Sequence, residues 1–143
     1  MNQILPYLVW VGHAGDGCAF AQLFDKEIRA VVQLVIEEPA IAMPREILYL
    51  RFPLFDGEGN EPAVLQLAVK TVSTLIEQNI STLVCCSAGM SRSPLVTAAA
   101  LMPIRGTSFA ECLRFVTHDR PADISPALLF ELRKVLAATD SAP

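Results

Sequence analysis

A cysteine and an arginine six positions apart have the residue types needed to process a phosphate group. The stretch CSAGMSRS runs from Cys86 to Ser93, follows the short apolar run Leu83 to Cys85 and precedes a run of helix formers, Leu95 to Met102. This order predicts a strand, a tight loop and a helix N-terminus. A loop that leads into a helix directs backbone N–H groups and the positive end of the helix dipole towards one point, which stabilises an anion.

The residues of this loop have different expected roles in phosphate chemistry. Cys86 lies in the electropositive field of the loop, which favours the thiolate, the nucleophilic form of cysteine. The planar guanidinium of Arg92 can donate to two phosphate oxygens at once. The expected substrate-binding positions are Ser87, Ala88, Gly89, Met90, Ser91 and Arg92. The nucleophile, the backbone amides that bind the oxyanion and the guanidinium that binds its charge are therefore predicted within seven residues.

The same stretch resembles the Cys-x5-Arg-Ser/Thr signature of cysteine-based protein phosphatases, and its AGxSRS form is most similar to the dual-specificity branch. The resemblance extends from Leu5 to about Leu136. It implies a hydrolase that acts on phosphotyrosine and/or phosphoserine/threonine in phosphorylated proteins through a phosphocysteine intermediate. It also implies that Ser93 donates a hydrogen bond to the Cys86 sulfur. No metal or other cofactor is expected, because Arg92 and the loop amides stabilise the charge.

An aspartate thirty residues before the cysteine matches the position of the family's general acid. Asp56 lies in the loop Phe55 to Glu61 (FDGEGNE), directly after an expected strand. A departing alkoxide or phenoxide needs a proton, and a thiolate has none to give. Alternatively, Asp56 only starts a turn with Gly57, and Glu58 is then the substitute acid. Asn60 is expected to shape this loop.

The residue before the nucleophile departs from the family pattern, because this chain has Cys85 where the family usually has histidine. That histidine is thought to hold the loop and support the thiolate, whereas a thiol donates only weakly. We therefore expect lower activity than is usual for the family. The adjacent thiols also allow oxidised Cys86 to form a disulfide, although a vicinal disulfide needs a strained geometry. Sulfenamide formation and over-oxidation are alternative fates.

Several other functions remain open on the sequence. A rhodanese-like sulfurtransferase would not need Asp56, and an arsenate reductase would need further redox cysteines at workable spacing. A non-catalytic phospho-binding module would keep Arg92 and lose turnover. A phosphatase of non-protein phosphomonoesters is a further alternative. Related enzymes that act on inositol phospholipids often carry lysines in this loop, and this loop has none, which favours phosphoprotein substrates.

Composition indicates one ordinary globular domain. The 143 residues, 52% hydrophobic and 18% charged, predict a single catalytic domain over residues 1–143. The net charge of −4 without a basic block argues against nucleic acid or an anionic membrane as a partner, and we expect a monomer. No apolar run approaches a membrane span of about 20 residues, and the N-terminus does not resemble a signal peptide. The four cysteines lack metal-ligand spacing and fit a reducing, cytoplasmic location.

Hydrophobic periodicity predicts the elements that position the loop. Strands are expected at residues 5–11, 30–36, 47–54 and 81–86. Helices are expected within residues 18–28, 62–78 and 95–102, from Ser108 and from Pro126, with breaks at Pro103 and Gly106 and a frayed tail from Thr139 to Pro143. This alternation predicts an α/β fold, with a central, mostly parallel sheet of four to five strands flanked by helices. The active site should lie at the carboxyl end of the Ser81–Cys86 strand.

Overall fold

A mostly parallel sheet forms the middle of the protein, whose computed structural model describes residues 1–140. Within these residues the strands are β1 (Asn2–Gln3), β2 (Val9–Gly12), β3 (Ala30–Leu34), β4 (Leu48–Phe52) and β5 (Thr82–Cys85). Their spatial order is β1-β2-β5-β3-β4. All neighbouring strands pair in parallel except β1, which is antiparallel to β2. The predicted fold is therefore confirmed.

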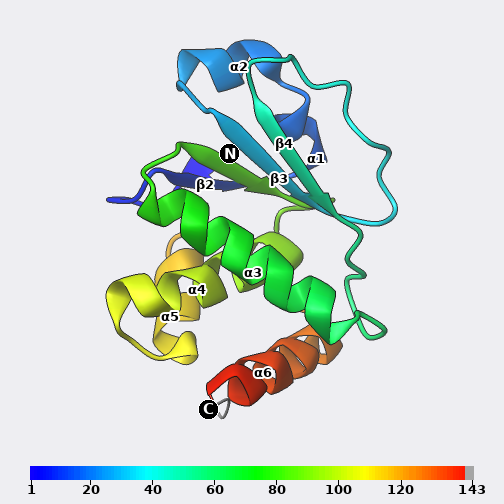
Figure 1. Ribbon diagram of the computed structural model, residues 1–143, viewed down its shortest axis with the longest axis vertical. Helices are drawn as coiled ribbons and strands as arrows, with labels where there is room; N and C mark the ends of the chain where they lie inside the picture. The colour runs from blue at the N-terminus through cyan, green and yellow to red at the C-terminus, as the bar shows by residue number, and fades with distance from the viewer. Residues whose placement is uncertain (141–143) are drawn as a thin grey trace.

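Helices cover both faces of this sheet (Figure 1). In the described part of the chain they are α1 (Ala14–Gly17), α2 (Phe20–Asp25), α3 (Pro62–Glu77), α4 (Arg92–Arg105), α5 (Phe109–Thr117) and α6 (Pro126–Asp140). Helices α1 and α2 lie on one face, and α3 to α6 lie on the other (Figure 1). The larger apolar core fills the α3–α6 side, and a smaller core around Trp10, Leu23 and Leu83 fills the α1–α2 side.

Strand β5 holds a central position because its side chains are buried on both faces of the sheet. Every residue of β5 and of its neighbour β3 is buried, as expected for parallel strands covered on two faces. Strand β5 pairs with β2 on one side and with β3 on the other. The segment that follows the carboxyl end of β5 is therefore attached to a strand that is hydrogen-bonded on both sides.

The N-terminal segment differs from the sequence prediction. The strand expected from residue 5 begins only at Val9, because the chain first turns back, with the Tyr7 N–H donating to the Ile4 carbonyl at 2.9 Å. This turn lets Asn2–Gln3 pair with β2. Alternation of apolar and polar residues could not predict β1, because a strand of two residues is too short to show it.

Two helices are longer than predicted. Helix α4 continues through Pro103, which the sequence treats as a breaker, and ends at Arg105, followed by the C-cap Gly106 in the left-handed conformation with φ 66°. The Gly106 N–H caps this end by donating to the Met102 carbonyl at 2.8 Å. The run from residue 92 to 101 is fully buried, so tertiary packing outweighs the local cost of the proline. Helix α6 includes Thr139, where a frayed tail was expected, and residues 141–143 of that tail lie outside the described residues.

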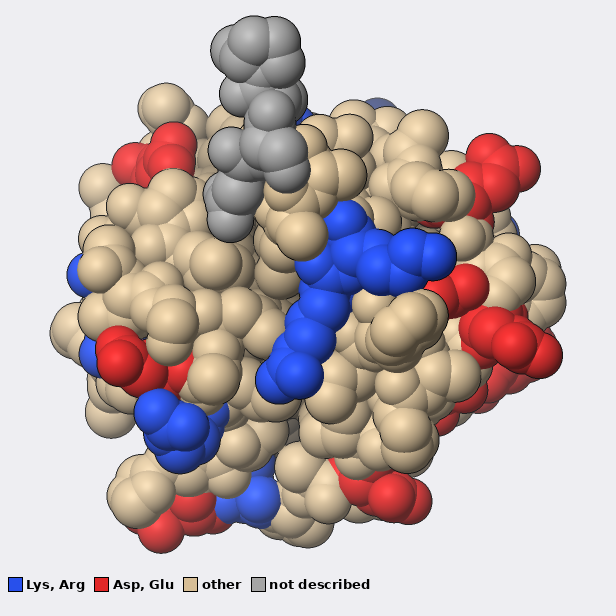
Figure 2. Space-filling view, turned by 90° about the horizontal axis from the view of Figure 1, so that it is seen from below, with Lys and Arg blue, Asp and Glu red and all other residues tan. Residues whose placement is uncertain are grey.

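Within residues 1–140, no helix is both long and apolar enough for a membrane span. The face seen from below in Figure 2 is mostly uncharged, with a short strip of basic side chains near the middle and acidic side chains mainly towards the edges. On this face the basic and acidic side chains are therefore largely separated.

Candidate active site

The loop that follows β5, residues 86–91, is called the nucleophile loop, and it folds tightly against the end of β2. Gly89 has φ 74°, and a Cβ at this position would lie 2.8 Å from the carbonyl carbon and oxygen of Gly12. The left-handed backbone and the close approach both require glycine. The Cys86 N–H donates to the Gly12 carbonyl at 3.4 Å, which ties the start of the loop to the sheet. The backbone of β2 thus sets the shape of the loop.

The candidate nucleophile lies inside this loop. Cys86 is 2% exposed, and its Sγ accepts a hydrogen bond from the Gly89 N–H at 3.2 Å. Helix α4 begins at Arg92, so the positive end of its dipole lies at the end of the same loop. A donated N–H and a helix N-terminus both favour a thiolate.

The preceding thiol belongs to the core and not to the loop. Cys85 is completely buried in the smaller core, and a Cβ on Gly17 of α1 would lie 3.2 Å from the Cys85 Sγ. Burial raises the pKa of the Cys85 thiol to about 12, with smaller contributions from charges on Cys86, Asp16 and Cys18. Cys85 is therefore neutral at physiological pH, and its thiol forms no hydrogen bond with the described residues of the loop.

Arg92 is fixed by a carboxylate that the sequence did not single out. Its guanidinium is 2% exposed and is bonded through both ends to Glu37, with Nη1 2.6 Å from Oε1 and Nη2 2.8 Å from Oε2. The hydrogen bond from Arg92 lowers the pKa of Glu37 to about 2, against the effect of burial. Burial alone would lower the pKa of Arg92, but the Glu37 carboxylate raises it. Both groups are therefore charged at neutral pH.

The remaining donors of Arg92 indicate how it would meet a phosphate. Nη1 also donates to the Leu54 carbonyl at 2.9 Å. Nε is buried and has no hydrogen-bond partner among the described residues. The N–H of Nε and the second N–H of Nη2 share one edge of the planar guanidinium. Glu37 thus binds the two terminal nitrogens of the Arg92 guanidinium. The edge formed by Nε and Nη2 keeps two free donors for an anion.

The structure brings the expected general acid and the expected nucleophile to one cavity. This cavity of about 160 Å³ is lined by Glu37, Asp56, Cys86, Ser87, Ala88, Met90, Ser91, Arg92 and Asp123. Asp56 is exposed, and its charge contributes to the raised pKa of Arg92. Glu58, the substitute acid, is not among the lining residues, so the geometry favours Asp56.

One expected contact is not formed. Ser93 is fully buried, but its Oγ has no hydrogen-bond partner among the described residues, the Cys86 sulfur included. The Cys86 Sγ is instead bonded by the Gly89 N–H. The hydroxyl of Ser93 therefore remains available, and its role in releasing the sulfur stays a prediction.

Sequence reasoning missed the residues that reach the loop from other elements. The Asp123 N–H donates to the Met90 carbonyl at 2.9 Å, and the Ser125 N–H donates to the Ser91 Oγ at 3.0 Å. Nothing in the local sequence reports these contacts. The position of Glu37 in the sequence did indicate a place near the nucleophile loop. Glu37 follows strand β3, and the carboxyl ends of neighbouring parallel strands meet at one edge of the sheet.

The segment with Glu37 and Glu38 is itself held in place. The Arg51 Nη2 donates to the Glu38 carbonyl at 3.0 Å, and the Gln33 Nε2 donates to the Pro39 carbonyl at 3.3 Å. The Ser87 Oγ lies within hydrogen-bond distance of Glu38 Oε1, at 3.0 Å, and of Glu37 Oε2, at 3.2 Å. Two carboxylates are therefore fixed beside the nucleophile loop.

A buried thiol, a guanidinium with a free two-donor edge and a carboxylic acid around one cavity define a cysteine-dependent phosphoryl-transfer site. The family model described as "Dual specificity phosphatase, catalytic domain" matches residues 9–137. The chain belongs to this family of cysteine-based protein phosphatases. The resemblance seen in the sequence is confirmed.

Individual relatives agree with this assignment. The chain is 31% identical over 130 residues to the Drosophila melanogaster dual specificity protein phosphatase Mpk3, covering 90% of this chain and 31% of that protein. It is 37% identical over 136 residues to the Arabidopsis thaliana protein-tyrosine-phosphatase IBR5, covering 93% of this chain and 50% of that protein. The chain thus spans about a third to a half of the length of these relatives. The crystal structure of human DUSP28 matches with a TM-score of 0.85 at 26% identity, covering 99% of each chain.

Proposed function

We propose that this protein hydrolyses phosphomonoesters on phosphorylated proteins, with Cys86 as the nucleophile and Asp56 as the general acid. The observation that carries the proposal is the shared cavity of Cys86, Asp56 and Arg92. Within it, the free edge of Arg92 and the amides of the nucleophile loop can bind the equatorial oxygens of a phosphoryl group, where transition-state charge gathers.

The reaction would proceed in two displacements. The Cys86 thiolate attacks phosphorus, forming an S–P bond as the P–O bond to the leaving group breaks, and the Asp56 proton passes to the leaving oxygen. Water then attacks the phosphocysteine and gives its proton to the ionised Asp56. The S–P bond breaks, inorganic phosphate leaves, and the sulfur departs as a thiolate that the Gly89 N–H stabilises. In this proposal Ser93 donates a hydrogen bond to the departing sulfur.

The surroundings of the cavity support singly phosphorylated protein side chains as the substrate class. Glu37 and Asp123 line the cavity, and Glu38 is bonded to Ser87 beside it. Fixed carboxylates repel additional phosphates on the same molecule, so polyanionic esters such as inositol phospholipids are disfavoured. We include both phosphotyrosine and phosphoserine/threonine in the proposal.

We also propose that the protein acts as a cytoplasmic monomer that binds neither nucleic acid nor membrane. All four cysteines, Cys18, Cys85, Cys86 and Cys112, are free thiols, and a catalytic thiolate needs a reducing compartment to stay free. Size-exclusion chromatography with light scattering tests the oligomeric state, and imaging of the tagged protein tests the location.

Hydrolysis of an aryl phosphate between pH 5 and 8, with a chelator present, tests the proposal directly. We expect turnover by the wild type, none by Cys86→Ser and a loss of about 10²- to 10⁴-fold in Asp56→Asn, the usual share of a general acid. In Asp56→Asn the fall in rate at high pH should also disappear, because the acid that must stay protonated is gone.

Matched variants separate catalysis from folding. Cys18→Ser removes an exposed thiol, and Glu58→Gln removes a carboxylate from the same loop as Asp56, so both should retain the wild-type rate. Absent turnover, with vanadate still bound by the wild type and lost in Arg92→Ala, would replace the proposal with a phospho-binding module. Absence of both turnover and vanadate binding would refute the site altogether.

A further inference from the structure

The segment that carries Asp56, residues 55–60, is called the acid loop, and its one apolar side chain, Phe55, is exposed and does not anchor it in the core. It contains two glycines, and Phe55 and Asp56 are both exposed. Asp56 forms no hydrogen bond with other described residues that would fix its carboxyl group. A loop of this composition loses much conformational entropy when it is held in one shape. Other groups must therefore position the acid.

Asn60 closes this loop from the inside. Its side chain is 8% exposed, its Oδ1 accepts from the Phe55 N–H at 2.8 Å, and its Nδ2 lies 3.1 Å from the Phe55 carbonyl and 3.0 Å from the Gly57 carbonyl. The residues on both sides of Asp56 are thus tied to one amide group. The loop becomes a closed ring with Asp56 at its outer edge.

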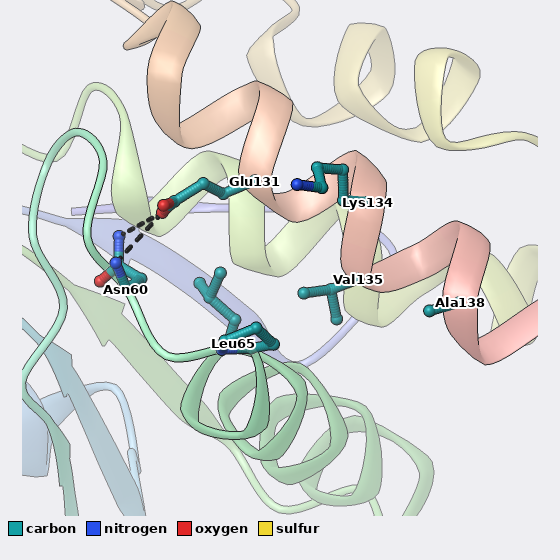
Figure 3. Close-up of a pocket in the computed structure, with 7 residues that line it drawn as sticks. Asn60, Leu65, Glu131, Lys134, Val135 and Ala138 are labelled. Atoms are coloured by element: carbon teal, nitrogen blue, oxygen red, sulfur yellow. Dashed lines mark hydrogen bonds between the residues drawn. The ribbon is translucent and has the colours of Figure 1, made fainter.

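Glu131 of α6 anchors that ring to the rest of the protein. Its Oε2 accepts from the Gly59 N–H at 2.8 Å, and its Oε1 accepts from the Asn60 N–H at 3.2 Å and from the Asn60 Nδ2 at 3.1 Å. Figure 3 shows the Asn60 and Glu131 side chains pointing towards each other across the gap between the loop and α6. Burial alone would raise the pKa of Glu131, but the donors of Gly59 and Asn60, together with Lys134, lower it.

The space beside this contact is not packed solid. A cavity of about 270 Å³ lies there, bounded by Asn60, Leu65, Glu131, Lys134 and Val135, among others (Figure 3). Because a cavity cannot support the loop by contact, the position of the loop depends on the hydrogen bonds that Gly59 and Asn60 donate to Glu131. Glu131 is 75 residues away from Asp56 in the sequence and is not among the residues that line the Cys86 cavity.

We propose that Glu131 is a positioning residue for the general acid: through Asn60 and Gly59 it holds the acid loop so that Asp56 meets the leaving oxygen. This inference rests on the proposed function, because it assumes that Asp56 protonates the leaving group. It adds that helix α6, none of whose residues lines the Cys86 cavity, positions the residue that protonates the leaving group.

The test compares aryl phosphates whose leaving phenols differ in acidity. A misplaced acid slows esters of weakly acidic phenols, which need the proton, and spares esters of strongly acidic phenols, which do not. We expect Glu131→Ala to lower kcat at least about tenfold on phenyl phosphate and less than about twofold on a fluorinated, acidic aryl phosphate. Glu131→Gln keeps one acceptor oxygen and should fall between the wild type and Glu131→Ala.

Glu77→Ala, which removes an exposed glutamate at the end of α3, serves as the control and should follow the wild type on every ester. Hydrogen exchange gives a readout that does not need activity. The Gly59 and Asn60 amides should exchange faster in Glu131→Ala than in the wild type, and at the wild-type rate in Glu77→Ala. If Glu131→Ala is too unstable to purify, the same comparison is made with Glu131→Gln.

The outcomes separate the two proposals. Equal loss on all esters, or unchanged exchange of the two amides, would overturn the positioning role while leaving the phosphatase function intact. Absence of turnover by the wild type on every ester would overturn the proposed function, and the positioning role with it. A loss that grows with the pKa of the phenol, together with faster amide exchange, would establish the role of Glu131.

Discussion

Replacing Glu37 by glutamine should cost stability in a way that depends on pH. The Glu37 carboxylate is bonded through both oxygens to a guanidinium that is 2% exposed, and this bond lowers its pKa from 4.5 to about 2. Glutamine has the same shape but carries no charge, and its NH₂ group would face one N–H of Arg92. The buried charge of Arg92 would then lose its counterion.

The pKa shift sets the size of the effect. A shift from 4.5 to about 2 corresponds to roughly 3 kcal/mol of differential interaction. Because the Glu37 side chain is 51% exposed, solvent screening reduces this value, and we expect a loss of about 1–2 kcal/mol at pH 7. The folded-state pKa is depressed, so this contribution is fully present above pH 4.5 and disappears as the pH falls through about 2.

Urea unfolding of the wild type and Glu37→Gln at several pH values between 7 and 3 measures this difference. The free energies of unfolding should differ by about 1–2 kcal/mol at pH 7 and approach each other below about pH 4. In parallel, kcat/KM on an aryl phosphate should fall about tenfold, because an Arg92 free to rotate no longer presents its side edge to the phosphate.

The neighbouring carboxylate provides the control. Glu38 is bonded to Ser87 and not to Arg92, so Glu38→Gln should change the stability by no more than about 0.5 kcal/mol. A Glu37→Gln deficit of the same size at pH 7 and pH 3 would contradict the ion-pair argument. An equal deficit in Glu38→Gln would show that the measurement reports general surface charge.

Two further predictions concern the nucleophile loop and the thiol before it. Gly89→Ala should weaken vanadate binding more than about tenfold in calorimetry, because a Cβ at φ 74° would lie 2.8 Å from the Gly12 backbone; unchanged affinity would show that the loop can move. With iodoacetamide at pH 8, mass spectrometry should find the exposed Cys18 alkylated and Cys85 unmodified in the folded protein, since burial raises the pKa of Cys85 to about 12. Modification of both at similar rates would place Cys85 nearer to solvent than the structure does.

The nucleophile loop could be predicted because its determinants are local. A buried strand, a small-residue loop and a helix N-terminus follow one another between Leu83 and Leu101, and the pattern of residue types reports each of them. Asp56 was found through the resemblance and through the need for a proton donor. Its place in the cavity with Cys86 follows from the topology of the sheet.

The missed parts of the site depend on contacts between distant segments. Glu37 meets Arg92 across 55 positions, and Glu131 meets Asn60 across 71, so no window of the sequence contains either pair. The length of α4 was underestimated for a related reason: Pro103 disfavours a helix locally, and only the burial of the preceding turns explains why the helix continues. Periodicity describes single elements well, and pairing between elements must be seen in the structure.

The position of β5 in the sheet has a consequence for how the protein loses activity. Strands at the edge of a sheet open in local fluctuations of low free energy, whereas a strand bonded on both sides opens only when the whole domain unfolds. Strand β5 is bonded to β2 and β3, and the nucleophile loop is tied to β2 through Gly12. The acid loop follows the edge strand β4 and is held by a few hydrogen bonds that it donates to Glu131 of α6. Mild heat or denaturant should therefore unfold the acid loop first and leave the nucleophile loop in place. The resulting state would still bind a phosphomonoester but would hydrolyse it slowly.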